Sequence, residues 1–448
     1  MKILIFGGRV IDPANGVDDL LNILVEDGRI AWLGKEQPAA DRAIDATGKI
    51  VTPGFVDIHM HEDPVKDGDI DQCIFPMYLR QGVTTAVGGN CGINVYDPAE
   101  YLNLVDEKGA AVNVAMFAGH EYFRKAAGAA DIYALATEEQ KAEMEKNIAS
   151  ALERGCVGVS FGLRYVPGAN KDEFFRAAKC CVPGRKLIAS HLRDDADGVF
   201  AAIDEFCEAG VEYKLPVQIS HIGSMGGFGQ MEEVLRKLDG YRAEGLDMAM
   251  DCYPYFAFST RIGTPTYDPG WLDRYHADYD VLEFCEGKYK GQRATAETFA
   301  EVRRDFPECI TVCHVMKEAD IRTAFRHEKV MLGSDGLVNN GQGHPRAAGS
   351  FPRFLCEFAG KSGLSLFDAV KKMTADPADR LRLPNKGRLS IGADADITVF
   401  DPLTVKDGAT FAAPATPPQG IEWVLLGGEV VLEHGRILDD RRGRAVRM

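Results

Sequence analysis

Six side chains that can bind a metal follow apolar, strand-like runs along the chain. They are His59, His61, Cys91, His191, His221 and Asp335. For any one of them, an ordinary polar strand end is an equally good interpretation. Ten histidines scattered at random, however, would not place four of them just beyond such runs. Imidazole and thiolate are ligands that suit zinc, so the set predicts a zinc centre.

The reaction that such a centre supports is hydrolysis. A catalytic zinc keeps one ligand position open for water and lowers the pKa of that water to about 7, which makes hydroxide available at neutral pH. Asp335 would then act first as general base and afterwards as general acid. Its alternative role is that of a metal ligand alone.

The elements that must position these residues are eight apolar runs alternating with amphipathic helical stretches. The runs are Gly54–Ile58, Thr84–Gly88, Val112–Ala118, Val157–Phe161, Lys186–Ser190, Pro216–Ser220, Met248–Cys252 and Val330–Ser334. The helical stretches include Glu138–Arg154, Gly198–Ala209 and Met231–Glu244. This alternation predicts an α/β fold, a TIM-like (β/α)8 barrel whose carboxyl-terminal strand ends form the active site. A doubly wound open sheet would produce the same local pattern.

The sequence at both ends of the chain indicates short strands joined by turns. They predict a small β-sandwich domain formed by residues 1–52 together with 386–448, around a metal-dependent barrel at 53–385. Independent terminal hairpins are the alternative. Ile310–Cys313 is one strand more than the barrel needs, so we expect an insertion at about 256–317 after the seventh strand. Long insertions at that end of a barrel are usually lids or binding walls.

Composition limits the partners and the location of the protein. The 448 residues are 46% hydrophobic and 26% charged, as expected of a globular protein. The net charge of −16 argues against nucleic acid or an anionic membrane as partner. No secretory signal or apolar run of membrane-spanning length is evident, and the 11 cysteines are irregularly spaced. We expect a cytoplasmic protein with a small-molecule partner; its oligomeric state stays open.

Several motifs resemble a known family. Gly54–His61 is similar to the first-strand motif of the amidohydrolase superfamily, and Gly387–Asp396 to its return into a β-sandwich. Asn90–Ile93 is more specific, because it resembles the metal-binding cysteine segment of the N-acyl-D-amino-acid deacylases (D-aminoacylases). Further segments similar to that family are Gly162–Gly168, Ser190–Asp194, Asp251–Tyr255, Gly333–Leu337 and His344–Arg346. The resemblance spans nearly the whole chain and is weakest in the insertion.

This resemblance implies a division of roles within the metal site. Cys91, His191 and His221 would hold one tightly bound Zn²⁺. His59 and His61 would frame a second, weaker metal position that can share Asp335, the catalytic acid–base residue. Many members of the superfamily bridge two metals with a carboxylated lysine from the fourth strand. Here Gly158–Phe161 contains no lysine, which agrees with a bridging role for Cys91.

The substrate-binding residues are less uniform. Relatives carry a lysine two residues past the histidine of the sixth strand, where this chain has Gly223, and an acid where it has Arg164. The candidates to contact a substrate carboxylate or carbonyl are Arg164, Tyr165, Tyr253, Ser259, His344 and Arg346. Arg164 has an alternative interpretation as the ion-pair partner of a nearby acid such as Asp194.

Three functions are compatible with these residues. The first is a zinc-dependent deacylase that cleaves the amide bond of N-acyl-D-amino acids. The second keeps the chemistry but opens a cyclic amide or ureide, such as a hydantoin or a dihydropyrimidine, and the cysteine motif argues against it. The third is a catalytically silent scaffold, which is disfavoured because all six ligand positions are filled.

Overall fold

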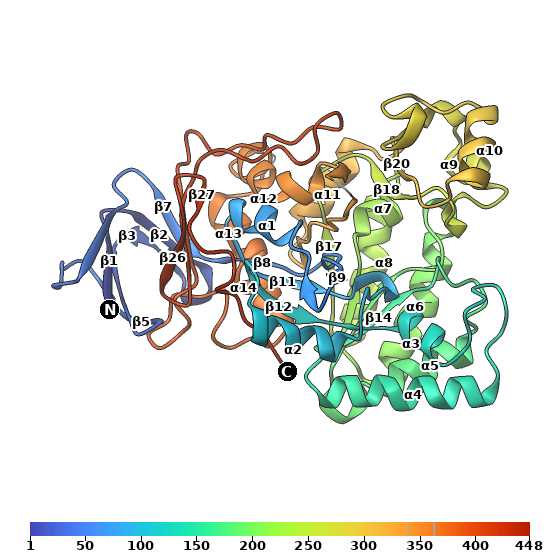
Figure 1. Ribbon diagram of the computed structural model, residues 1–448, viewed down its shortest axis with the longest axis horizontal. Helices are drawn as coiled ribbons and strands as arrows, with labels where there is room; N and C mark the ends of the chain where they lie inside the picture. The colour runs from blue at the N-terminus through green and yellow to red at the C-terminus, as the bar shows by residue number, and fades with distance from the viewer. Residues whose placement is uncertain (340, 362) are drawn as a thin grey trace.

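The computed structural model describes residues 1–339, 341–361 and 363–448, and parallel strands lie at its centre (Figure 1). One sheet has the order β12-β11-β8 and the other the order β13-β14-β15-β16-β17-β21. Their strands are β8 (Phe55–Asp57), β11 (Val83–Gly88), β12 (Asn113–Met116), β13 (Ala118–Gly119), β14 (Gly158–Gly162), β15 (Leu187–His191), β16 (Val217–Ile219), β17 (Met248–Cys252) and β21 (Val330–Leu332). Each of the eight predicted runs therefore overlaps at least one strand.

Two places link the sheets. The predicted strand Val112–Ala118 is interrupted at Phe117, so β12 belongs to the first sheet and β13 to the second. At the other edges, Met60 and Gly336 form a parallel bridge. The backbone N–H of Asp335 donates to the carbonyl of His59 at 2.8 Å. This α/β arrangement of parallel strands fits a barrel.

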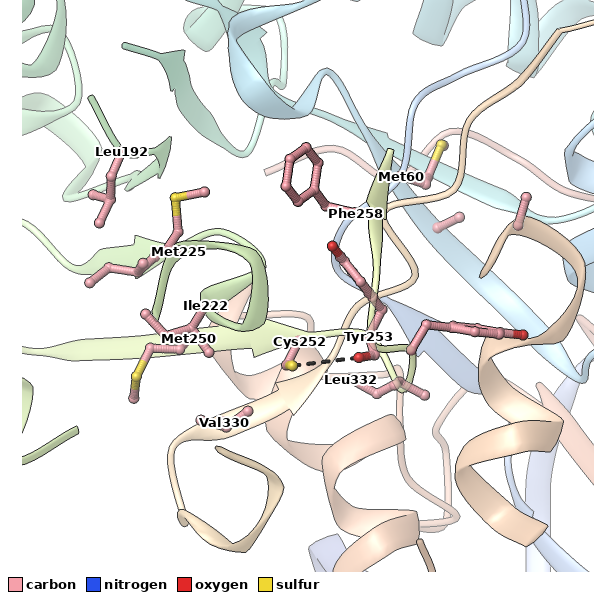
Figure 2. Packing of buried hydrophobic residues seen from close by; sticks show 14 of the residues in the cluster. Met60, Leu192, Ile222, Met225, Met250, Cys252, Tyr253, Phe258, Val330 and Leu332 are labelled. Carbon is pink, nitrogen blue, oxygen red and sulfur yellow. Dashed lines mark hydrogen bonds between the residues drawn. The ribbon is translucent and has the colours of Figure 1, made fainter. Parts of the chain in front are cut away.

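Helices cover the strands, as the apolar patterns predict. The three predicted helices are present as α4 (Glu138–Glu153), α6 (Val199–Tyr213) and α8 (Met231–Ala243). A capping box between Thr137 and Gln140 fixes the start of α4. Every residue of β11, β14, β15 and β17 is buried, as expected of parallel strands covered on both faces. Figure 2 shows Met250 and Cys252 of β17 near Val330 and Leu332 of β21 in this core.

The described part of the chain has further α-helices outside residues 256–317. They are α1 (Phe75–Arg80), α2 (Pro98–Lys108), α3 (His120–Ala126), α5 (Lys171–Lys179), α7 (Ile222–Gly226), α11 (Glu318–Arg326), α12 (Arg346–Glu357), α13 (Leu366–Met373) and α14 (Ala375–Arg380). None of the described helices is both long enough and apolar enough to cross a membrane.

Strands from both ends of the chain share one of the two sheets at the left of Figure 1, the seven-stranded one. A four-stranded sheet has the order β5-β4-β1-β6, and a seven-stranded sheet has the order β27-β26-β25-β24-β7-β2-β3. The strands are β1 (Lys2–Phe6), β2 (Arg9–Asp12), β3 (Val17–Leu20), β4 (Asn22–Glu26), β5 (Arg29–Gly34), β6 (Arg42–Asp45), β7 (Ile50–Pro53), β24 (Ile397–Phe400), β25 (Ile421–Leu426), β26 (Glu429–Glu433) and β27 (Arg436–Ile437). Side chains of both termini, such as Ile3 and Ile397, pack into one apolar cluster.

The segment between β17 and β21 forms a small sheet of its own, drawn in yellow in Figure 1. Its strands β18 (Phe258–Arg261), β20 (Ile310–Cys313) and β19 (Leu282–Phe284) are antiparallel, with β20 in the middle. The helices α9 (Trp271–Tyr275) and α10 (Ala296–Asp305) lie beside them. Ile310–Cys313 thus pairs outside the parallel sheets.

Candidate metal centre

Four of the predicted ligands meet in one buried cluster at the ends of parallel strands. The ligand atoms of His59, Cys91, His221 and Asp335 all lie within 4.8 Å of one another. The Cys91 Sγ is 3.5 Å from the Nε2 of His59 and 3.4 Å from the Nε2 of His221. The Nε2 of His59 is also 3.4 Å from the Oδ1 of Asp335. Residues far apart in the sequence therefore converge on one point.

The other two predicted ligands border this cluster. The Nδ1 of His191 is 3.1 Å from the Nε2 of His221, and the Nε2 of His61 is 3.3 Å from the Oδ1 of Asp335. His191 therefore adjoins the His221 side of the cluster and His61 adjoins the Asp335 side. The structure brings all six predicted ligands together.

The spacing of these atoms fits a metal ion. Tetrahedral zinc with ordinary bond lengths to nitrogen and sulfur separates neighbouring ligand atoms by about 3.3–3.6 Å. The contacts of Cys91 with His59 and His221 fall in this range. The donor set of one thiol, imidazoles and a carboxylate matches the preferences of zinc.

The backbone is strained where it presents these side chains. Cys91, His221 and Asp335 have φ values of 54°, 34° and 49°. Residues other than glycine rarely adopt this left-handed region, at a free-energy cost of about 1–3 kcal/mol each. Such conformations persist where the surrounding structure enforces them, and they are concentrated at functional sites. Three in one cluster indicate that the positions of these side chains matter more than local stability.

Charge around the cluster favours ionisation of Cys91 and Asp335. Burial favours the neutral thiol of Cys91, but His59 and His221 hold the pKa of that thiol well below its usual range. Burial also opposes ionisation of Asp335, but Arg346 and His221 hold the pKa of its carboxyl well below the usual value. Thiolate and carboxylate are the forms that bind metals.

The buried carboxylate of Asp251 orients two of the predicted metal-binding histidines, His59 and His221. The Oδ1 of Asp251 lies 3.0 Å from the Nδ1 of His59 and accepts the backbone N–H of His221 at 2.7 Å. Its Oδ2 accepts from the Nε2 of Gln218 at 2.9 Å. Metal-binding histidines typically use such a partner to fix tautomer and ring orientation. Sequence reasoning did not assign Asp251 a role, although its position at the end of β17 was a usable signal.

Arg346 reaches the centre of the site. Its Nη1 is 2.8 Å from the Oδ2 of Asp335, and its guanidinium lies 4.7 Å from the centre of the Tyr253 ring. Its Nε has no hydrogen-bond partner among the described residues. The ring of Tyr165 lies 4.6 Å from that of His191. A guanidinium with unused donors beside a metal cluster can hold a carboxylate.

Two predicted substrate residues have protein partners instead. The Nη2 of Arg164 contacts Asp194 and lies 3.3 Å from Asp195, which corresponds to the alternative interpretation of this arginine. The Nε2 of His344 is bonded to the carbonyl of Ala257 at 3.1 Å. Tyr253 is fully buried beneath Arg346.

Two cavities adjoin the cluster, and we name them the outer and the inner cavity. The outer cavity has a volume of about 380 Å³. Residues that line it but do not line the inner cavity include His61, Ile93, Val95, Ile132 and Pro265. The inner cavity has a volume of about 20 Å³. Residues that line it but do not line the outer cavity are Asp195, His191, His221, Ser224, Met225, Phe258 and Thr266. Both are lined by Tyr165, Ser259, Thr260, Asp335 and Arg346.

Comparison with known proteins identifies relatives over the full length of the chain. The model of the Amidohydrolase family matches residues 292–432. The N-acyl-D-glutamate deacylase of Alcaligenes xylosoxydans xylosoxydans is 35% identical, over 96% of this chain and 93% of that protein. The D-aminoacylase of the same organism is 32% identical, over 99% and 97%. Dihydroorotases are more distant, with 26% identity for that of Geobacter metallireducens.

Solved structures agree with these relatives. The N-acyl-D-glutamate deacylase of Bordetella bronchiseptica, in complex with zinc and a phosphonate inhibitor that mimics the tetrahedral intermediate, superposes with a TM-score of 0.90. It is 31% identical, and the match covers 100% of this chain and 99% of that one. The chain belongs to the N-acyl-D-amino-acid deacylase (D-aminoacylase) family of the amidohydrolase superfamily.

Proposed function

We propose that this protein hydrolyses the amide bond of N-acyl-D-amino acids. The observation that carries the proposal is the buried cluster of His59, Cys91, His221 and Asp335, in a chain 35% and 32% identical to relatives named N-acyl-D-glutamate deacylase and D-aminoacylase. The products would be a carboxylate and a free D-amino acid.

The residues divide between two metal positions in this proposal. Cys91, His191 and His221 hold a tightly bound zinc ion, while His59, His61 and Asp335 frame a second, weaker position. The Cys91 thiol is nearly equidistant from His59 and His221, at 3.5 and 3.4 Å, which supports a place between the two positions. When bound, zinc supplies a Lewis acid that polarises the amide carbonyl and promotes ionisation of water.

Asp335 carries the proton in this proposal. Its side chain is only 8% exposed to solvent yet lines both cavities, so it faces the substrate. It is ionised before the reaction, because Arg346 and His221 lower its pKa. Asp335 accepts a proton from the attacking water and then donates it to the departing amine nitrogen.

Arg346 binds the substrate carboxylate in this proposal. It is buried beside Asp335, 2.8 Å from that carboxylate, and it lines both cavities. Tyr165 and Ser259 line the same cavities and are placed to contact the substrate with it. The contacts of Arg164 with Asp194 and Asp195 leave that residue a structural role.

The experiment is hydrolysis of N-acetyl and N-formyl derivatives of D- and L-amino acids, including the acidic ones, by zinc-loaded protein. Release of free amine from D compounds is the expected result, and no release from any of them would contradict the proposal. Hydantoins and dihydropyrimidines assayed in parallel distinguish the alternative, since a cyclic-amide hydrolase would open those rings. Protein that retains no zinc after gentle purification would instead favour a silent scaffold.

We also infer that the two groups of parallel strands close into a (β/α)8 barrel at 53–385. The Met60–Gly336 bridge and the Asp335–His59 hydrogen bond support closure. The terminal strands would form a small β-sandwich domain from residues 1–52 and 386–448, which the cluster shared by Ile3 and Ile397 supports. Residues 256–317 would be an insertion that walls the active site, because Phe258 and Thr266 line the inner cavity.

The charge of −16 supports a small-molecule partner rather than nucleic acid or a membrane. From the eleven cysteines, all of which are free thiols in the structure, we infer a cytoplasmic location.

A further inference from the structure

The inner cavity is too small for most of a substrate molecule. Its volume of about 20 Å³ is enough for roughly one water-sized group. The amino-acid half of an N-acyl amino acid carries an α-carbon, a carboxylate and a side chain, which together are far larger. The acyl half can be as small as a hydrogen or a methyl group on the carbonyl. Whichever half points inward must therefore be a short acyl group.

The walls of the inner cavity cannot easily give way. Met225 of α7 and Phe258 of β18 are only 1% and 7% exposed, and Figure 2 shows both among the buried core residues. The ring of Phe258 packs against those of Tyr267 and Tyr275, with centroids 6.4 and 5.5 Å away. Close-packed side chains of this kind resist the insertion of additional atoms.

The polar side of the inner cavity is fixed as well. Tyr275 donates a hydrogen bond to the Oδ2 of Asp195 at 2.6 Å. The Oδ1 of Asp195 forms ion pairs with the Nε of Arg274 at 2.9 Å and the Nη2 of Arg164 at 3.3 Å. The carboxylate of Asp195 is thus held by three neighbours, and it cannot swing aside to enlarge the cavity.

The outer cavity offers the remaining space. It is about 380 Å³ in volume, and His61 and Asp335 border it. It shares Arg346 with the inner cavity. An amino-acid half that lies outward can therefore keep its carboxylate on Arg346 and its nitrogen near Asp335.

We propose that the inner cavity binds the acyl substituent and restricts this enzyme to N-formyl and N-acetyl substrates, with Met225 and Phe258 as the residues that set the limit. This inference rests on the proposed deacylase function. It assigns acyl-chain selectivity to the wall formed by α7 and the segment around β18, and side-chain selectivity to the outer cavity.

The test compares formyl, acetyl, butyryl and hexanoyl derivatives of the D-amino acid that the enzyme hydrolyses best. The kcat/KM of wild-type protein should fall at least about tenfold from acetyl to butyryl, because a packed wall must be displaced. Met225→Ala should raise the butyryl-to-acetyl ratio several-fold, since the shorter side chain opens the cavity. Phe258→Leu is the second variant, in case Met225→Ala does not fold; the melting temperature of each variant reports folding.

Val95→Ala is the matched control, because Val95 lines only the outer cavity. It should leave the butyryl-to-acetyl ratio unchanged. Wild-type protein that hydrolyses butyryl and hexanoyl substrates as fast as acetyl would overturn the inference and leave the deacylase function intact. Folded Met225→Ala and Phe258→Leu variants with the wild-type ratio would also overturn it. No turnover of any compound would reject the deacylase function and the inference with it.

Discussion

Replacing Asp251 by Asn should weaken zinc binding without removing a metal ligand. Asp251 contacts the Nδ1 of His59 at 3.0 Å and accepts the backbone N–H of His221 at 2.7 Å. Asparagine has nearly the same shape and can still accept hydrogen bonds through one oxygen, but it carries no charge. The substitution therefore tests the electrostatic contribution of the carboxylate with little change in packing.

The expected magnitude follows from the hydrogen bonds that change. A hydrogen bond to a charged group contributes about 1.5–3 kcal/mol, and loss of a carboxylate partner of a metal-binding histidine typically reduces metal affinity about 10–100-fold. The two estimates agree, because 10–100-fold corresponds to about 1.4–2.7 kcal/mol. We therefore expect the dissociation constant for zinc to rise by one to two orders of magnitude.

The assay is zinc affinity measured by competition with a chelator of known affinity, with circular dichroism to establish folding. Asp396→Asn is the matched control. Asp396 is a buried carboxylate paired with Lys386 at 2.6 Å, and it is not part of the metal cluster. The control should lower stability and leave zinc affinity unchanged. A folded Asp251→Asn protein with wild-type zinc affinity would refute the reasoning.

Three further predictions concern the substrate site. Arg346→Lys should lower kcat/KM about tenfold or more, mainly by raising KM, because lysine cannot make the paired contacts of a guanidinium. Steady-state kinetics on the best substrate measures this change. An unchanged KM would contradict the prediction. Gly223→Lys should reduce the free energy of unfolding by about 1–3 kcal/mol, because the new side chain would be overpacked. Its Cβ would lie 2.7 Å from the Cδ1 of Ile321 and 2.9 Å from the Sγ of Cys252. A melting temperature equal to that of the wild type would contradict this prediction. Arg164→Gln should lower the melting temperature but leave the preference between acidic and neutral side chains unchanged, because Arg164 already pairs with Asp194 and Asp195. A changed preference in a substrate panel would restore a direct substrate role.

The metal ligands could be predicted because residues that follow parallel strands in the sequence lie together at the carboxyl-terminal ends of those strands. His59, His191 and Asp335 stand just past separate apolar runs, and parallel strands bring such positions to one end of the sheets. The strands themselves were predictable for the same reason, since burial on both faces requires continuous apolar runs. Strand ends differ from the predictions by one or two residues, as between Val330–Ser334 and the observed β21.

The partners of Arg164 and the inner cavity depend on contacts that no local pattern specifies. Asp194 is thirty residues from Arg164 in sequence, so its ion pair could be named only as one alternative. The inner cavity combines Met225 of α7 with Thr266, which lies beyond β17 and β18. The left-handed backbone conformation of Cys91, His221 and Asp335 could not be predicted from these residue types either, because glycine and asparagine are the residues that usually adopt it.

The most direct test of the account is zinc content per chain, measured on the same preparation as amine release from N-acetyl-D- and L-amino acids, before and after chelation. A zinc-dependent deacylase should contain bound zinc and release amine from D compounds, lose that activity with the metal and regain it when zinc is restored. Zinc-loaded, folded protein that releases no amine from any D compound, or release that continues after the zinc has been removed, would contradict the proposed function.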